Sequence, residues 1–145
     1  MQINPYLNFN GQCEEAFKVY EKCLNGKIEF QMTHEDSPMA DKTPPEWGKK
    51  IMHATLRFGD QVIQGADAPP QYYEKPQGFS VCISLKDAAE AERIFGELSA
   101  NGSVRMPLEK TFWADRFAMF TDRFGIPWII NCQRAAYQPQ TSAAD

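Results

Sequence analysis

The chain has 145 residues, of which 43% are hydrophobic and 23% charged, and its formal net charge is −4. This length and composition are typical of one globular domain that can bury a core. A mildly acidic protein lacks the basic face that neutralises phosphates, so nucleic acid is excluded as the main partner. The sequence has no apolar run of the roughly 20 residues that span a membrane, and residues 1–9 do not resemble a signal peptide. We therefore expect a cytoplasmic protein without a membrane partner.

The first half of the chain begins with a strand at residues 3–9 and a turn at Asn10-Gly11. A helix over residues 12–25 is predicted because apolar residues recur there with helical spacing. We expect Gly26 to end this helix as a left-handed C-terminal residue. A proline-bearing loop over residues 33–49 separates the first two of the three strands that follow. The apolar helix positions are Cys13, Ala16, Phe17, Tyr20 and Leu24, and the strands are residues 27–32, 51–58 and 61–64.

The second half repeats this order of elements. A strand is predicted at residues 79–85, and a helix at residues 87–101 follows it. Asp87 is placed to cap the helix, and Glu90 stands where a capping box needs it. Gly102 ends the helix. The apolar positions of the helix are Ala91, Ile94, Phe95 and Leu98, and the three remaining strands are residues 104–107, 117–121 and 128–131.

The two halves resemble one another beyond the order of their elements. Leu24-Asn25-Gly26 corresponds to Ala100-Asn101-Gly102 at the ends of the two helices. We interpret this as an internal duplication. The predicted fold is therefore α+β, with two tandem βαβββ units in one domain. The units cover residues 1–67 and 78–133, the linker residues 68–77, and a flexible tail residues 134–145.

Several segments resemble the PhnB-like branch of the glyoxalase and bleomycin-resistance superfamily, also called the vicinal oxygen chelate superfamily. The resemblance covers residues 3 to about 132, and its more specific segments are Thr111-Phe112-Trp113 and Asp122-Arg123-Phe124-Gly125. It implies a half-barrel in which both units curl around a cleft, and a homodimer. An activity does not follow from a shared fold.

The resemblance also implies four positions where metal-binding members carry His or Glu. Counting from the helices and turns places them at Asn4, at Ile63 or Gln64, at Ser80 and at Ile129. None is a histidine or a carboxylate, so we expect neither a tightly held metal nor another cofactor. The alternative is a His₂Glu site that uses both histidines, His34 and His53. His53 alone has two open interpretations, as a core histidine or as a group facing the cleft.

Other motifs exclude further chemistries. The glycines form no G-x-G-x-x-G, which argues against a dinucleotide or S-adenosylmethionine site, although PhnB-like sequences often carry a demethylubiquinone methyltransferase description. There is no G-x-S-x-G for Ser–His–Asp catalysis. The four cysteines have no CxxC spacing, and their simplest interpretation is that of buried apolar thiols: Cys13, Cys23, Cys82 and Cys132.

We therefore predict a cleft protein that binds a small organic molecule and whose activity is undetermined. We expect Trp128 to pack between sheet and helix instead of facing the ligand. One alternative is a metal-dependent lyase, isomerase or dioxygenase, and another is a resistance-type protein that sequesters its ligand. The predicted ligand-binding residues are Tyr6, Asn8, His53, Gln64, Ser80 and Trp113.

Overall fold

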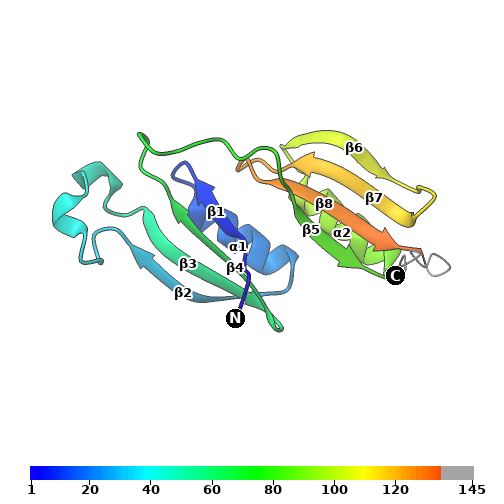
Figure 1. Cartoon of the computed structure of the whole chain (residues 1–145), viewed down its shortest axis with the longest axis horizontal. Helices are drawn as coiled ribbons and strands as arrows, with labels where there is room; N and C mark the ends of the chain where they lie inside the picture. The colour runs from blue at the N-terminus through cyan, green and yellow to red at the C-terminus, as the bar shows by residue number, and fades with distance from the viewer. Residues whose placement is uncertain (135–145) are drawn as a thin grey trace, which may run out of the picture.

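Two four-stranded sheets, each with one α-helix, make up the chain in a computed structural model that describes residues 1–134 (Figure 1). The first unit contains β1 (Tyr6–Phe9), α1 (Cys13–Cys23), β2 (Lys27–Thr33), β3 (Ile51–Phe58) and β4 (Gln61–Asp67). The second contains β5 (Val81–Leu85), α2 (Ala88–Leu98), β6 (Ser103–Glu109), β7 (Ala114–Thr121) and β8 (Pro127–Gln133). Most of the predicted tail, residues 135–145, lies outside the described residues. No helix within residues 1–134 is long and apolar enough to cross a membrane.

Both sheets have the same topology. The strand orders are β1-β4-β3-β2 and β5-β8-β7-β6. In each sheet the first strand pairs with the fourth in parallel, and the remaining neighbours are antiparallel. The predicted α+β fold of two tandem βαβββ units is therefore confirmed.

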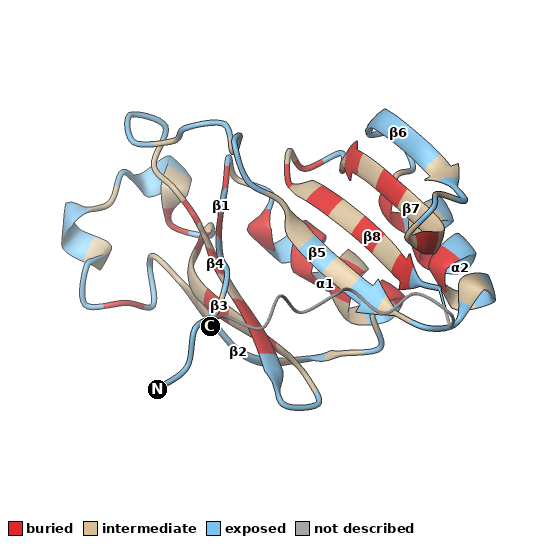
Figure 2. Cartoon of the chain, turned by 45° about the vertical axis from the view of Figure 1, so that its right-hand side comes forward, coloured by how far each residue is buried: buried red, intermediate tan, exposed pale blue. Residues whose placement is uncertain are grey.

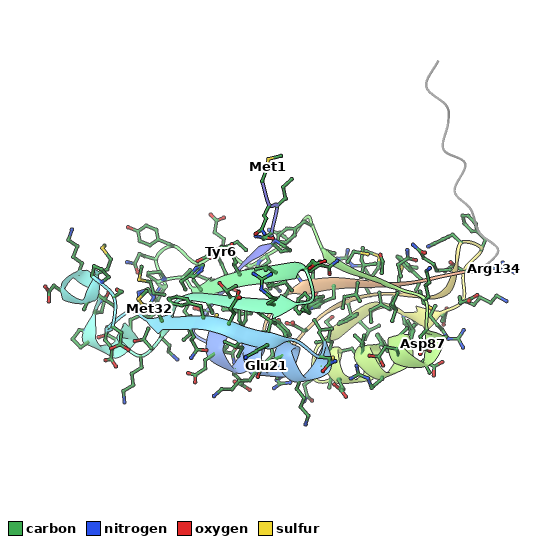
Figure 3. All side chains as sticks on the ribbon, turned by 90° about the horizontal axis from the view of Figure 1, so that it is seen from below. Met1, Tyr6, Glu21, Met32, Asp87 and Arg134 are labelled. Carbon is green, nitrogen blue, oxygen red and sulfur yellow. The ribbon has the colours of Figure 1, made fainter. Side chains whose placement is uncertain are left out.

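Both helices cover the same side of the two sheets. Seen edge-on, α1 and α2 lie below the sheets, and the opposite faces carry no helix (Figure 3). Buried residues alternate with more exposed ones along β7 and β8 (Figure 2), as expected for strands with one face on the core. We call the helix-free sides the open faces of the first and second sheets.

The helices bury most of the predicted apolar positions, whereas Leu24, just after α1, and Phe95 of α2 are only partly buried. In α1, Cys13, Ala16, Phe17 and Tyr20 are all inaccessible to solvent. Gly65 of β4 lets α1 approach closely, because a Cβ there would lie 2.9 Å from the ring of Phe17. In α2, the same role falls to Ala91, Ile94 and Leu98.

Both helices end on an asparagine, which corrects the prediction for the two glycines. Asn25 and Asn101 are the left-handed residues, with φ of 54° and 59°. The following glycines are needed for space. A Cβ on Gly26 would lie 3.0 Å from the carbonyl oxygen of Arg57, and one on Gly102 only 2.2 Å from that of Thr121. The Asn-Gly pair thus serves the same two purposes in each unit.

Two strands begin later than predicted. β1 begins at Tyr6 and β5 at Val81, so Asn4 and Ser80 lie in the segments before the strands. β4 is longer than predicted because the buried carboxylate of Asp67 holds its end. That carboxylate accepts the backbone N–H groups of Cys13 at 2.9 Å and Ile51 at 2.8 Å.

The predicted cap of α2 is confirmed in part. The side chain of Asp87 accepts the backbone N–H groups of Ala89 and Glu90 at 2.9 and 3.4 Å. Glu90 does not complete the capping box, because its carboxylate accepts a hydrogen bond from Arg93 at 3.0 Å. Arg93 also donates to the carbonyl oxygen of Cys23 at 2.8 Å and so links α2 to the end of α1.

Asp122 joins the two units. Its buried carboxylate accepts the hydroxyl of Tyr20 from the first unit and the indole N–H of Trp128 at 2.8 Å. It also accepts the backbone N–H groups of Phe124 and Ile126 at 2.9 and 3.0 Å. The ring of Trp128 packs edge-on against Tyr20, with centroids 5.2 Å apart and only 1% of the residue exposed. The expected packing of Trp128 between sheet and helix is confirmed.

Candidate functional site

The open face of the first sheet carries four of the predicted site residues. Tyr6 and Asn8 alternate with the buried Leu7 and Phe9 along β1, so they point away from α1. Gln64 of β4 stands beside Tyr6 in the strand register. His53 of β3 completes the group. The neighbouring Ile63 is buried in the core, so of the two positions considered for β4 only Gln64 reaches this face.

His53 lies at the centre of a short polar chain. Its Nδ1 is 3.3 Å from the hydroxyl of Tyr6, and its Nε2 is 3.3 Å from the hydroxyl of Thr55. The ring of Phe30 from β2 flanks it, with centroids 5.9 Å apart. Partial burial, with a smaller contribution from Cys13, raises the pKa of the Tyr6 hydroxyl, which therefore stays protonated at neutral pH. His53 is partly exposed and does not belong to the buried core.

This arrangement can exchange a proton or orient a polar ligand group. A neutral imidazole has one donor and one acceptor nitrogen, and each faces a hydroxyl that can take either role. The pair of hydroxyls therefore tolerates both tautomers and the protonated ring. Sequence reasoning missed Thr55 and Phe30. Period-two spacing from His53 identifies Thr55, whereas Phe30 reaches the face only through a register shift in β2 between Ile28 and Phe30.

A cavity adjoins this group where the linker between the units passes β1. It has a volume of about 570 Å³, within the range of small-molecule sites. Tyr6, Asn8 and Ile126 contribute to its lining. The segment between β4 and β5 contributes aromatic rings and one charge of each sign, from Tyr72, Phe79, Glu74 and Lys75. Tyr6 thus belongs both to the polar chain around His53 and to the wall of the cavity.

The open face of the second sheet is more apolar. Trp113 precedes β7 and packs edge-on against Phe112 and Phe117, with centroids 4.7 and 5.2 Å apart. Asn131 of β8 lies beside Phe117 in the register, and its side-chain oxygen is buried without a hydrogen-bond partner among the described residues. Such an orphaned acceptor is costly unless a donor reaches it. The sequence prediction omitted Asn131, although its alternation with the buried Trp128 and Ile130 signals this face.

The predicted residues therefore fall into two groups. Tyr6, Asn8, His53 and Gln64 share one face, whereas Trp113 lies in the other unit. In Figure 1, β3 of the first sheet and β7 of the second lie apart, with β4, β5 and β8 between them in space. Ser80 is partly exposed at the end of the linker and belongs to neither group.

The potential metal ligands are dispersed within residues 1–134, where no three His, Cys, Asp or Glu side chains come together. His34 contacts the carbonyl oxygen of Asp67 through Nε2 at 3.3 Å, and His53 is held by hydroxyls. The interpretation of all four cysteines as buried is wrong for Cys82, which is exposed, because it alternates with Val81 and Ile83 on the open side of β5.

The sequence and the overall fold were compared with those of known proteins. The model of the 3-demethylubiquinone-9 3-methyltransferase family matches residues 1–131. Protein YjdN of Escherichia coli is 31% identical over 139 residues, which are 90% of this chain and 95% of that protein. The crystal structure of protein PA1353 from Pseudomonas aeruginosa has 47% identity and a TM-score of 0.84, and covers 92% of this chain and 98% of its own.

More distant structures share the fold. The PhnB protein from Bacillus cereus has a TM-score of 0.77 at 21% identity, covering 91% of this chain and 99% of its own. The fosfomycin resistance protein FosX from Mesorhizobium loti has a TM-score of 0.57 at 11% identity and covers 93% of both chains. The match to the family model, together with the tandem βαβββ units, places the chain in the glyoxalase and bleomycin-resistance superfamily. Within it, the chain belongs to the PhnB-like branch, the family described as 3-demethylubiquinone-9 3-methyltransferase.

Proposed function

We propose that this protein binds a small organic molecule on the open faces of its sheets and orients it through hydrogen bonds and shape, without a tightly held metal. The observation that carries the proposal is the His53 ring between the hydroxyls of Tyr6 and Thr55. These groups serve no helix packing, because α1 covers the opposite face. The adjoining cavity of about 570 Å³ supplies room for a ligand.

The chemistry of the two faces defines the ligand class. Asn8, Gln64 and His53 offer donors and acceptors without a fixed charge, and Tyr6 adds both a ring and a hydroxyl. The second sheet offers the aromatic group of Trp113 and the unpaired oxygen of Asn131. A ligand with an apolar body, polar substituents and a hydrogen-bond donor matches this set.

Native mass spectrometry of the purified protein tests the proposal. We expect a small molecule to copurify or, from a metabolite extract, to bind saturably. His53→Ala should weaken its binding at least tenfold, the loss of about 1.4 kcal/mol, while Tyr6→Phe should weaken it less because the ring remains. Lys22→Ala on the exposed side of α1 is the matched control. Equal affinity in His53→Ala would show that the ligand binds elsewhere.

The chemical fate of the ligand separates binding from catalysis. Recovery of the molecule unchanged after incubation supports a sequestering role, whereas a changed molecule supports an enzyme in which His53, held by its two hydroxyl neighbours, takes a proton from the ligand or gives one to it. The name of the matching family supplies a third outcome, methyl transfer, which incubation with S-adenosylmethionine and mass detection of a methylated product tests directly.

The proposal that the ligand is bound without a metal is supported by the residue types at the expected metal positions. Gln64 and Ile129 face the open sides of the sheets, and Asn4 and Ser80 precede the strands. Amides and hydroxyls are weak ligands for Zn²⁺, Ni²⁺ or Fe²⁺. Elemental analysis should find no stoichiometric transition metal at the site, and added divalent ions should not confer glyoxalase activity. About one metal per chain that disappears in His53→Ala would support the metal-dependent alternative.

We also propose that the chain is a cytoplasmic homodimer with one domain over residues 1–133. The apolar side chains exposed around the open faces support association, since Phe30, Phe79, Phe112 and Met106 are each at least 40% exposed. Covering them would also enclose a ligand that a single chain leaves open to solvent. Light scattering coupled to size-exclusion chromatography should give twice 16.5 kDa. A monomer mass across micromolar concentrations would contradict the proposal.

A further inference from the structure

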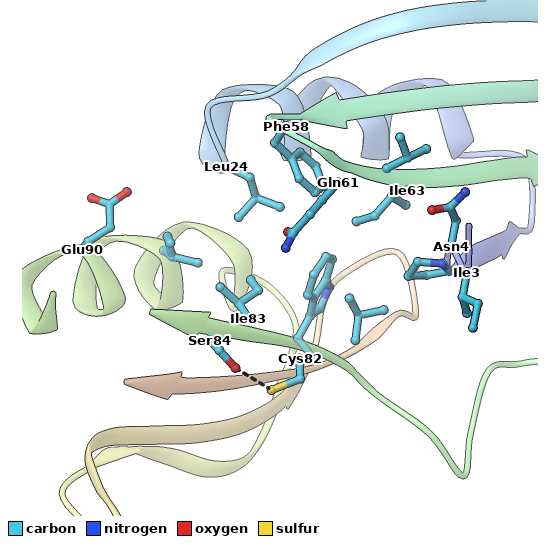
Figure 4. A pocket seen from close by; sticks show the side chains of 15 residues that line it. Ile3, Asn4, Leu24, Phe58, Gln61, Ile63, Cys82, Ile83, Ser84 and Glu90 are labelled. Carbon is cyan, nitrogen blue, oxygen red and sulfur yellow. Dashed lines mark hydrogen bonds between the residues drawn. The ribbon is translucent and has the colours of Figure 1, made fainter. Parts of the chain in front are cut away.

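A second cavity lies at the seam between the two units, apart from the open-face site. It has a volume of about 570 Å³. Both units contribute walls, and Figure 4 shows Leu24, Phe58 and Ile63 on one side with Ile83 on the other. The buried ring of Trp128 forms part of the lining. Its indole N–H is already donated to Asp122, so Trp128 offers only apolar surface.

Two amide side chains at this cavity are unused by the protein. Gln61, at the start of β4, extends into the space between Leu24 and Ile83, and Asn4 lies at the rim (Figure 4). Neither side chain makes a hydrogen bond within residues 1–134. Each amide provides a donor and an acceptor. They are therefore free to hold a polar group of a bound molecule.

The edge of β5 adds backbone groups. β5 is the outer strand of the second sheet and, within residues 1–134, pairs only with β8, so its other edge has N–H and C=O groups without a strand partner in that part of the chain. Cys82, Ile83 and Ser84 of this strand line the cavity. A molecule in the seam thus meets apolar side chains in the interior and hydrogen-bonding groups along one border.

The charges at the seam favour a neutral ligand. Among the described residues that line the cavity, Glu90 is the one charged residue, and Arg93 holds its carboxylate at 3.0 Å on the exposed surface of α2. Within residues 1–134, no cationic side chain lines the cavity to receive an anion. Placing an unpaired charge among Leu24, Ile63 and Ile83 is costly.

We infer that the seam is a second binding site, which takes a neutral, mainly apolar small molecule carrying an amide-like donor and acceptor. Gln61 and Asn4 hold the polar group, and the walls from both units enclose the apolar part. Because the ligand contacts both units, its binding stabilises their arrangement along with the Tyr20–Asp122 hydrogen bond. This inference does not depend on the open-face site.

The neutral fluorophore N-phenyl-1-naphthylamine tests the inference, with its anionic relative 1-anilinonaphthalene-8-sulfonate as comparison. The chain has three tryptophans, so the double variant Trp47→Phe/Trp113→Phe leaves Trp128 alone. We expect saturable binding of the neutral probe, quenching of Trp128 emission by energy transfer, and a higher melting temperature. The anionic probe should bind at least tenfold more weakly.

Substitutions at Gln61 locate the probe. Gln61→Phe should fill the cavity and lower affinity at least tenfold, and Gln61→Ala should lower it about fivefold through one lost hydrogen bond. Gln31→Phe and Gln31→Ala, on the exposed edge strand β2, are matched controls and should change nothing. Circular dichroism melting curves verify that each variant is folded.

Four results would overturn the inference. They are no saturable binding of the neutral probe, unchanged Trp128 emission, equal affinity in Gln61→Phe, and equal affinity for the anionic probe. Loss of binding in His53→Ala with retention in Gln61→Phe would assign the probe to the open face. Absence of binding would overturn the inference whether the protein is a monomer or a dimer.

Discussion

The two units share a backbone plan but differ in what their open faces carry. The first sheet presents hydroxyl, imidazole and amide groups around His53, whereas the second presents Trp113, Phe117 and one unpaired amide oxygen at Asn131. The features retained in both units are those that the fold requires, such as Asn-Gly at each helix end. Side chains on an uncovered face can differ without cost to the core, so two units with one backbone plan can carry different faces.

Each unit also contains a buried carboxylate near the end of its sheet. The two carboxylates differ in the number of hydrogen-bond donors that they bind and in whether those donors come from one unit or from both. Asp67 binds two backbone N–H groups within the first unit, while Asp122 has four donors and links both units. We expect Asp122→Ala to cost about 4 kcal/mol and Asp67→Ala about 3 kcal/mol, since each leaves buried donors unpaired. Urea unfolding measures both. A larger cost at Asp67 would mean that the link between units adds little.

The glycines that follow the two helices should differ in how much stability is lost when each is replaced by alanine. Gly102→Ala should cost about 3 kcal/mol because its Cβ would meet a backbone oxygen at 2.2 Å. Gly26→Ala should cost about 1–2 kcal/mol, since its nearest neighbour at 2.8 Å is the ring of Phe58, which can move.

Gly96 provides the control for both changes. It lies inside α2 with nothing within 4 Å of an added Cβ. Gly96→Ala should therefore stabilise the protein by about 0.5–1 kcal/mol through helix propensity. Thermal melting of the three variants gives the ranking, and equal effects at Gly26 and Gly102 would contradict it.

Trp113 distinguishes a ligand-facing ring from a core ring. Its partial exposure predicts that Trp113→Ala costs about 1–2 kcal/mol, less than the ~3–5 kcal/mol of a packed tryptophan such as Trp128. Binding of the open-face ligand should weaken in Trp113→Ala. A drastic drop in melting temperature with unchanged ligand affinity would assign Trp113 to the core.

Alkaline pH should destabilise the protein through buried thiols of the first unit. Burial raises the pKa of Cys23 to about 12, well above its value in an unfolded chain. The folded state therefore holds this proton more tightly, and the resulting stability is present below about pH 8.5 and lost as the pH rises toward 12. Between pH 8 and 9.5 the loss should be about 1 kcal/mol.

The variant Cys23→Ala tests this assignment. It should reduce the slope of urea unfolding stability against pH between pH 8 and 9.5 but not abolish it, because burial also raises the pKa of Cys13. Cys82→Ala, which removes an exposed thiol, is the control and should leave the slope unchanged. If the unfolding free energy of Cys23→Ala falls with pH as steeply as that of the parent chain, groups other than Cys23 cause the loss of stability.

The sequence alone determined the order of elements, its repetition in the two halves and the burial of most positions of the helix stripes. These follow from local periodicity: apolar residues at helical spacing, such as Ala16, Phe17 and Tyr20, can be buried together only on one side of a helix. Alternation along β1 likewise placed Tyr6 and Asn8 on the face away from Leu7 and Phe9.

Only the tertiary structure decided which residues of different strands and units come into contact. The contact of His53 with Tyr6 and Thr55, the bond from Tyr20 to Asp122 and the seam cavity join residues far apart in the chain. Register shifts in β2 and the late start of β5 moved Phe30 onto the open face and Ser80 off its strand. Strand register and the docking of two units depend on packing between distant segments, and local sequence patterns carry little information about that packing.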